Sequence, residues 1–135
     1  MQDRVFISIE TTGINTSTDK IVEIAALKID KNNLKSLFHQ IINPEKEIDK
    51  NISNIIGYSN EELKKYPKIN EINESFINFI NSSTLIGHNN DFIFNFLNSL
   101  INSLPKSSSP KQPIKAAGTL SFRNAHTTLA GAPPR

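Results

Sequence analysis

Three short apolar runs near the N-terminus limit the folds open to this chain more than any other feature. They cover residues 4–9 (RVFISI), 20–29 (KIVEIAALKI) and 34–42 (LKSLFHQII). Each run is rich in β-branched residues and bounded by turn-forming residues: TTG at 11–13, DKNN at 30–33 and NP at 43–44. Because the links between the runs are short, the pattern predicts three strands in an antiparallel meander.

Helical patterns follow the meander. Ser59 or Asn60 is predicted to cap a short helix that begins at Glu61 and is closed by Pro67. Apolar residues at helical spacing predict an amphipathic helix over 70–81, and a second apolar stripe from 93 to 104 predicts another. Between these helices, TLIG at 84–87 is too short for a helix and too apolar for a surface loop, so it is predicted to be a buried strand.

This order of elements predicts an α/β fold. The meander supplies three antiparallel strands, and a helical crossover brings strand 84–87 in parallel beside the first strand. The result is a mixed sheet flanked by helices, which we assign to a domain spanning residues 1–104. Residues 105–135 begin with PKSSSPKQP, a composition typical of linkers, and are predicted to form an irregular tail with a weak helical pattern at 121–132.

Charge is unevenly distributed between these two parts. The tail holds five lysines and arginines and no acid, so the net charge of +2 divides into +5 for the tail and −3 for residues 1–104. A basic tail suits an electrostatic arm for nucleic acid, but charge alone favours the simpler reading of a solvated, disordered terminus.

The absence of cysteine rules out disulfides and thiolate metal sites and favours a cytoplasmic location. No apolar run approaches the roughly 18 residues that a membrane span needs. The first residues, MQDRVFISIE, do not resemble a signal peptide. We therefore expect no membrane partner.

Two polar clusters could carry chemistry. In SIETTG, Glu10 ends a predicted central strand, where a carboxylate can hold a metal, and Gly13 lets the backbone approach a ligand closely. In GHNNDF, His88 and Asn89 lie where a strand meets a helix N-terminus, a place that favours anions. Each cluster also has an ordinary interpretation: a strand ending in a turn, and a helix capped by Asn89 or Asn90.

Read in order, the motifs resemble a known family. They are Phe-x-x-x-Glu-Thr-Thr-Gly, Ile-Val-Glu-Ile-Ala, Ile-Asn-Pro, Ile-x-Gly and Gly-His-Asn-x-x-Phe-x-x-x-Phe-Leu, and they run from Val5 to about Leu104. This series is similar to the DEDDh (DnaQ-like) 3′–5′ exonucleases, which include proofreading subunits of bacterial DNA polymerase and RNA-trimming nucleases. The resemblance implies a ribonuclease H-like fold and two-metal hydrolysis of a phosphodiester, with four carboxylates holding Mg²⁺ or Mn²⁺ and a histidine as general base.

Most of the metal-binding positions differ from the family's pattern. Its Asp-x-Glu motif reads Ser8-Ile9-Glu10 here, and the aspartate of its His-Asn-x-x-Phe-Asp motif is replaced by Ile93. In the tail, His126 fits the general base and Gly131 stands where the last aspartate belongs. The resemblance thus leaves Glu10 and His126 as catalytic residues and Glu10 alone as a metal ligand, which predicts weak or lost binding of Mg²⁺ or Mn²⁺.

Other acids do not replace the missing ligands convincingly. Asp91 lies about 200° around a helix from Ile93. Glu23 could approach the sheet edge but is not a metal ligand in the family, and Asp19 lies in a loop of unknown direction. The resemblance implies that the four positions 8, 10, 93 and 131 converge on one cleft.

The resemblance also assigns substrate contacts and partners. It places Thr11, Thr12, Gly13, Ile14, His88 and Asn89 near the terminal nucleotide. The expected partner is the 3′ end of a single-stranded nucleic acid, and a DNA polymerase subunit is a second candidate. Three functional hypotheses remain: a catalytically impaired binding domain for DNA or RNA 3′ ends, an active exonuclease with unusual ligands, and a truncated or decayed product without specific activity.

Overall fold

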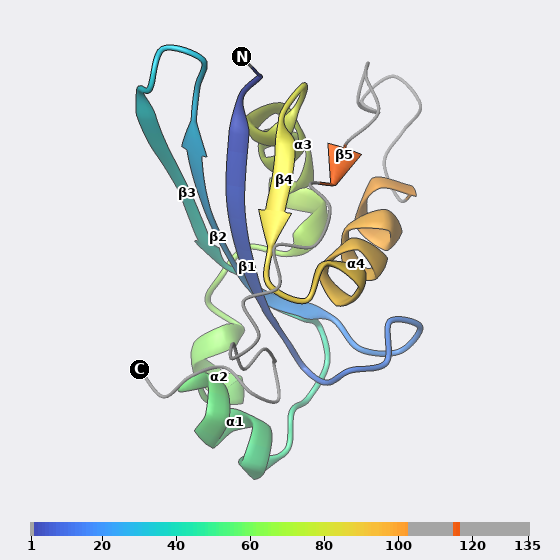
Figure 1. The fold of residues 1–135 in the computed structure, drawn as a ribbon. Coiled ribbons are helices and arrows are strands. Elements are labelled where there is room, and N and C mark those ends of the chain that lie inside the picture. Colours follow the sequence, from blue (N-terminus) through green and yellow to red (C-terminus); the bar gives the residue numbers. More distant parts are fainter. Residues whose placement is uncertain (1, 103–114, 117–135) are drawn as a thin grey trace.

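A computed structural model of the chain describes residues 2–102 and 115–116 (Figure 1). Its strands are β1 (Arg4–Thr11), β2 (Ile21–Ile29), β3 (Lys35–Ile41), β4 (Thr84–Gly87) and β5 (Lys115–Ala116). Its helices are α1 (Lys50–Ile56), α2 (Asn60–Leu63), α3 (Ile69–Ile80) and α4 (Asn90–Asn102). The three predicted strands of the meander, the predicted helix at 70–81 and the predicted strand at 84–87 are all present.

The sheet has the strand order β3-β2-β1-β4-β5. Neighbours β3, β2 and β1 are antiparallel, whereas β4 runs parallel to β1. This arrangement confirms the predicted mixed sheet and the crossover that brings strand 84–87 beside the first strand. It also places the carboxyl ends of β1 and β4 at the same edge of the sheet.

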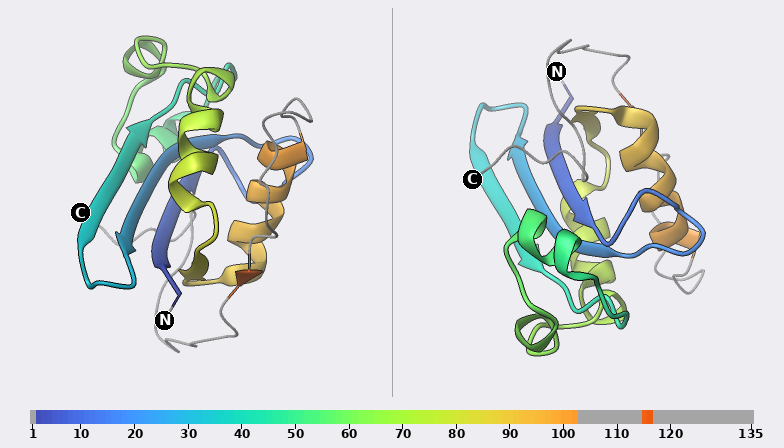
Figure 2. Two further views of the ribbon diagram at one scale, coloured as in Figure 1. Left: turned by 90° about the horizontal axis from the view of Figure 1, so that it is seen from above. Right: turned by 90° about the horizontal axis from the view of Figure 1, so that it is seen from below.

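Helices α3 and α4 lie on one face of this sheet (Figure 2). Their apolar sides pack against alternate residues of the strands and form the main core, in which Val5, Phe76, Ile80 and Leu97 are almost completely buried. Burial of such side chains stabilises the fold by about 1.5–3 kcal/mol each. The core is therefore built between the sheet and one helical layer.

Helices α1 and α2 form a smaller cluster near the start of β2. Val22, Ile48, Ile56 and Leu63 are its buried members. Helix α1 was not predicted, although its ends carry the usual signals: the Asp49 side chain accepts a hydrogen bond from the Ile52 N–H, and Gly57 takes a φ of 83°. For α2, the predicted cap is confirmed, since Ser59 forms a capping box with Glu62.

Strand β5 falls within the segment predicted as tail. It pairs in parallel with β4, through Lys115 opposite Thr84 and Ala116 opposite Leu85. The division into a domain at 1–104 and a tail at 105–135 stays a prediction, and the helical pattern at 121–132 lies outside the described residues. Among the helices that the structure describes, none is long and apolar enough to cross a membrane.

Candidate functional site

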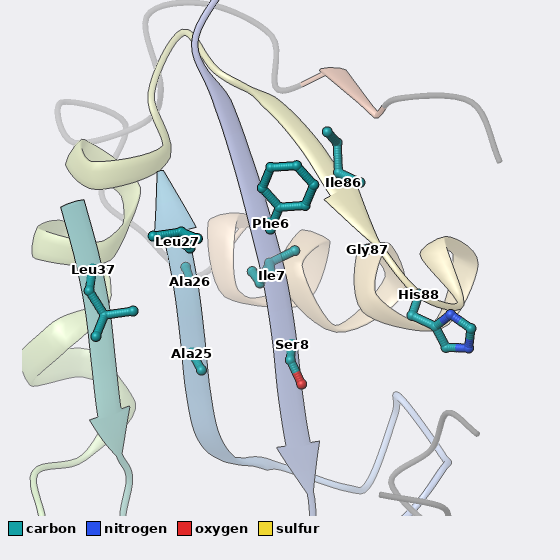
Figure 3. A pocket seen from close by; sticks show the side chains of 10 residues that line it. All are labelled: Phe6, Ile7, Ser8, Ala25, Ala26, Leu27, Leu37, Ile86, Gly87 and His88. Carbon is teal, nitrogen blue, oxygen red and sulfur yellow. The ribbon is translucent and has the colours of Figure 1, made fainter. Parts of the chain in front are cut away.

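Strand β1 divides its side chains between two faces of the sheet. Val5, Ile7 and Ile9 point into the core, so Phe6, Ser8 and Glu10 lie on the opposite face. There, Phe6 and Ser8 meet their antiparallel partners Leu27 and Ala25. With Leu37, Ile86 and His88 they line a hollow of about 330 Å³ (Figure 3). No helix of the described ranges covers this face (Figure 2).

Glu10 lies beyond Ser8 on the same face, and it is 8% exposed. Its direct cross-strand partner is Glu23, which is 5% exposed. One Glu23 oxygen, Oε2, lies 2.6 Å from Nε2 of His39 on β3. The strand register shifts between Glu10 and Thr11, and β1 ends at Thr11, one residue after this carboxylate.

The loop that follows β1 is organised by its own polar groups. Thr12 N–H donates to the Lys20 carbonyl at 2.8 Å, and the Thr12 hydroxyl donates to Asp19 Oδ1 at 2.8 Å. Thr11 and Thr12 are buried, whereas the Ile14 side chain is 71% exposed. The loop extends from the carboxyl end of β1 toward α4 (Figures 1 and 2).

Asp19 receives several hydrogen bonds in this loop. Burial alone would raise the pKa of its carboxyl group, but the opposing contributions are larger. They are the hydrogen bonds from Lys46, the Asn15 backbone and Thr12, together with the charge of Lys46, and they lower the pKa below its ordinary value of 3.8. Asp19 is therefore an anion at neutral pH.

His88 and Asn89 follow β4 at the same edge of the sheet. Asn89 is exposed and has a φ of 59°, a conformation that asparagine tolerates better than most residues. Its carbonyl accepts the first hydrogen bond of α4, from Ile93 N–H at 3.2 Å. Asn90 Oδ1 accepts from Gly87 N–H at 3.0 Å, which ties the helix start to the strand end. Both His88 and Ser8 line the hollow on the open face (Figure 3).

Ile93 does not join this group. It is 5% exposed and packs in the main core with Leu97 and Leu100, on the face that the helices cover. A Cβ atom at Gly87 would lie 2.7 Å from Ile93 Cδ1, which shows how closely the isoleucine fills the space below the end of β4. Of the four positions expected to converge, Ser8 and Glu10 share a face and Ile93 lies in the core. Gly131, like His126, lies outside the described residues.

The described residues do not fit a two-metal site. They contain no group of three or more His, Asp or Glu side chains able to hold one ion. Ser8 offers a hydroxyl and Ile93 a buried alkyl chain, whereas Mg²⁺ and Mn²⁺ prefer several carboxylate oxygens.

The sheet order, the parallel pairing of β1 with β4 and the carboxylate at the end of the central strand define a ribonuclease H-like α/β domain. A family model described as "Exonuclease" (RNase_T) matches residues 5–117. The chain belongs to this exonuclease family, the DnaQ-like group. This confirms the resemblance drawn from the motifs.

Two relatives of similar sequence are bacterial DNA polymerase III proteins. DNA polymerase III subunit epsilon of Treponema pallidum is 34% identical over 105 residues, covering 78% of this chain and 46% of that protein. The PolC-type DNA polymerase III of Thermotoga petrophila is 34% identical over 93 residues, covering 69% of this chain and 7% of that protein. The chain thus spans less than half the length of these relatives.

Solved structures of exonuclease I share the fold. The product-bound structure superposes with a TM-score of 0.70 at 15% identity, over 87% of this chain and 30% of that chain. The structure of E. coli exonuclease I in complex with a dT13 oligonucleotide gives a TM-score of 0.69 at 14% identity, over 86% of this chain and 27% of that chain. At these identities the likeness concerns the fold.

Sequence reasoning missed two pairs at the site. One is Glu23 with His39, whose contact depends on the register of three strands. The other is Asp19 with Lys46, which lie 27 residues apart in sequence and 2.8 Å apart in space. For the second pair, the sequence shows only that Asp19 stands directly before the apolar run at 20–29. That position does not indicate Lys46 as its partner.

Proposed function

We propose that this domain binds the 3′ end of a single-stranded nucleic acid at the carboxyl edge of its sheet and is impaired in hydrolysing it. The observation that carries the proposal is the pair Ser8 and Glu10, which lie on one face of β1 with a hydroxyl in place of the first carboxylate. The burial of Ile93 in the core supports it, because this position cannot supply a ligand.

Binding is supported by the parts of the site that keep the family's residues. Thr11, Thr12 and Gly13 turn the chain at the sheet edge, and Ile14 offers an exposed apolar side chain to a nucleobase. His88 and Asn89 add polar groups at the same edge of the sheet, directly after β4. Lysines and arginines of the tail at 105–135 would add phosphate contacts that weaken with salt.

The relatives support candidate partners, and the motifs support candidate roles in catalysis. The name of the epsilon relative makes a DNA polymerase subunit a candidate partner, and the dT13 complex of exonuclease I makes single-stranded DNA the first substrate to test. In the family, Glu10 would be a metal ligand and His126 the general base. Divalent ions supply an activated water and stabilise charge on the phosphate. With a single one of the four carboxylates retained, we propose that Mg²⁺ or Mn²⁺ binds weakly or not at all.

A second candidate is an active exonuclease with unusual ligands. The position of Glu23 opposite Glu10 favours it, since it brings a second carboxylate to the face that holds the first. Against it stands the short contact of Glu23 with His39, which occupies one of its oxygens.

Fluorescence anisotropy with a 5′-labelled single strand tests the binding proposal. Ile14→Ser should weaken binding about fivefold, because the contact with a nucleobase would lose an apolar side chain that is only partly removed from water. Leu34→Ser is the matched control, because Leu34 is 66% exposed and lies in the β2–β3 turn at the far end of the sheet. Equal effects of the two substitutions, or no binding by the unaltered chain, would refute the proposal; DNA and RNA strands compared in parallel identify the substrate.

A further inference from the structure

We infer that the ion pair of Asp19 with Lys46, called the clamp below, holds the β1–β2 loop in the conformation that binds the 3′ end. Both residues are therefore positioning residues. The inference rests on the proposed function, because it concerns the same site. Neither residue belongs to the motifs from which the family resemblance was drawn.

The clamp is built around one carboxylate. Asp19 Oδ1 accepts from the Thr12 hydroxyl at 2.8 Å and from Lys46 Nζ at 2.8 Å, and Oδ2 accepts from Asn15 N–H at 3.0 Å. The Asp19 side chain is 14% exposed and the Lys46 side chain 37% exposed, so these bonds lie at the surface with the carboxylate partly covered. A single side chain thus fixes the start and the middle of the loop.

Lys46 ties the loop to a distant segment. It follows β3, and besides Asp19 its ammonium group donates to the Thr18 carbonyl at 3.1 Å. The loop is therefore held from outside as well as from within. Without Lys46, the partly buried Asp19 carboxylate would lose its one cationic partner among the described contacts, and charge-assisted bonds of this kind are roughly twice as strong as neutral ones.

Gly13 shows that the clamp touches the residues proposed to bind the substrate. A Cβ atom at this position would overlap the Asp19 carboxylate, with Cγ only 2.7 Å away. Asp19 therefore packs directly against the Gly13 backbone, and the next residue, Ile14, is held out in solvent at 71% exposure. Preorganising an exposed apolar side chain in this way lowers the entropy cost of binding.

The charge of Asp19 and its role in holding the loop predict opposite effects of Asp19→Asn on the affinity for a single strand. Asp19 is an anion beside a site for a polyanion, so charge alone predicts that Asp19→Asn strengthens binding. The clamp predicts instead that Asp19→Asn weakens it, because the loop loses its charge-assisted bond to Lys46. We expect a loss of about tenfold, the equivalent of one such hydrogen bond.

The test measures anisotropy of a 5′-labelled single strand with the full chain, at several salt concentrations. Glu74→Gln is the matched control, since it removes the same charge from an exposed position of α3 and should leave affinity unchanged or slightly higher. Lys46→Gln, at an exposed position, should weaken binding without altering its salt dependence. A direct phosphate contact would instead lower the salt slope by about one.

The affinities of the variants separate the clamp from the proposed function. Weaker binding by Asp19→Asn and Lys46→Gln with an unchanged salt slope supports the clamp. Should Asp19→Asn not fold, Lys46→Gln and its salt slope decide alone. If the unaltered chain binds and Asp19→Asn binds as well or better, the clamp is wrong while the proposed function stands. If the unaltered chain does not bind at all, both fall.

Discussion

Glu10 and Glu23 lie directly opposite each other on the antiparallel strands β1 and β2, on the face of the sheet that α3 and α4 leave open, and both are nearly buried. Cross-strand partners have Cβ atoms about 5 Å apart, so two like charges here destabilise the fold unless they are compensated. Glu23 Oε2 lies 2.6 Å from His39 Nε2, so a ring nitrogen is within hydrogen-bond distance of this carboxyl group. Ser8, next to Glu10 on the same face, adds no further charge.

Restoring the missing carboxylate should therefore reveal this crowding. Ser8→Asp is expected to lower the Tm without metal, because a third carboxyl group is crowded against Glu10 and Glu23, and to recover stability when Mn²⁺ is added. Thermal unfolding with and without MnCl₂ measures both effects. Ser8→Asn, of nearly the same shape without charge, is the control, and an equal response of the two variants to Mn²⁺ would show that position 8 does not face a metal site.

The packing of Ile93 below the end of β4 gives a second prediction. Gly87→Ala places a Cβ atom 2.7 Å from Ile93 Cδ1 and 3.0 Å from Asn90 Oδ1, so overpacking should cost about 1–3 kcal/mol of unfolding free energy. In an Ile93→Val background, which lacks the Cδ1 atom, part of this cost should disappear. Chemical denaturation of the unaltered chain, the two single variants and the double variant measures the interaction energy between positions 87 and 93. If the two single effects simply add up in the double variant, this account of the packing is wrong.

The lowered pKa of Asp19 makes its contribution to stability depend on pH. A carboxyl group with a folded-state pKa below its ordinary value of 3.8 stabilises the fold fully above that value, and this stabilisation is lost as the pH falls through the folded-state pKa. The difference in unfolding free energy between the unaltered chain and Asp19→Asn should therefore be largest near neutral pH and shrink below about pH 4. A difference that grows toward acidic pH would contradict the arrangement of Asp19, Thr12 and Lys46.

Much of the fold could be predicted from periodicity. The strand at 84–87 was predicted with the bounds that the structure shows, and the helix at 70–81 differs by one residue at each end. The last helix begins at Asn90, before its apolar stripe starts, because the first turn is set by the left-handed Asn89 and the bond from Gly87 to Asn90. Helix α1 was missed since its 7 residues are too few for a periodic pattern to stand out.

The site was less predictable, because it depends on contacts between segments. The motifs singled out Ser8 and Glu10, and the alternation of β1 explains why they share a face. The burial of Ile93 agrees with the apolar stripe of its helix. By contrast, the contacts of Glu23 with His39 and of Asp19 with Lys46 depend on strand register and loop conformation, and no local pattern encodes either of them.

We propose that this member of the exonuclease family binds 3′ ends and is impaired in hydrolysing them. The most direct test follows a 5′-labelled single strand with a free 3′ end on a denaturing gel, with excess protein and either Mg²⁺ or Mn²⁺. We predict that the strand stays at full length under conditions in which anisotropy shows it to be bound. Stepwise shortening by the unaltered chain that disappears in Glu10→Ala would contradict the claim.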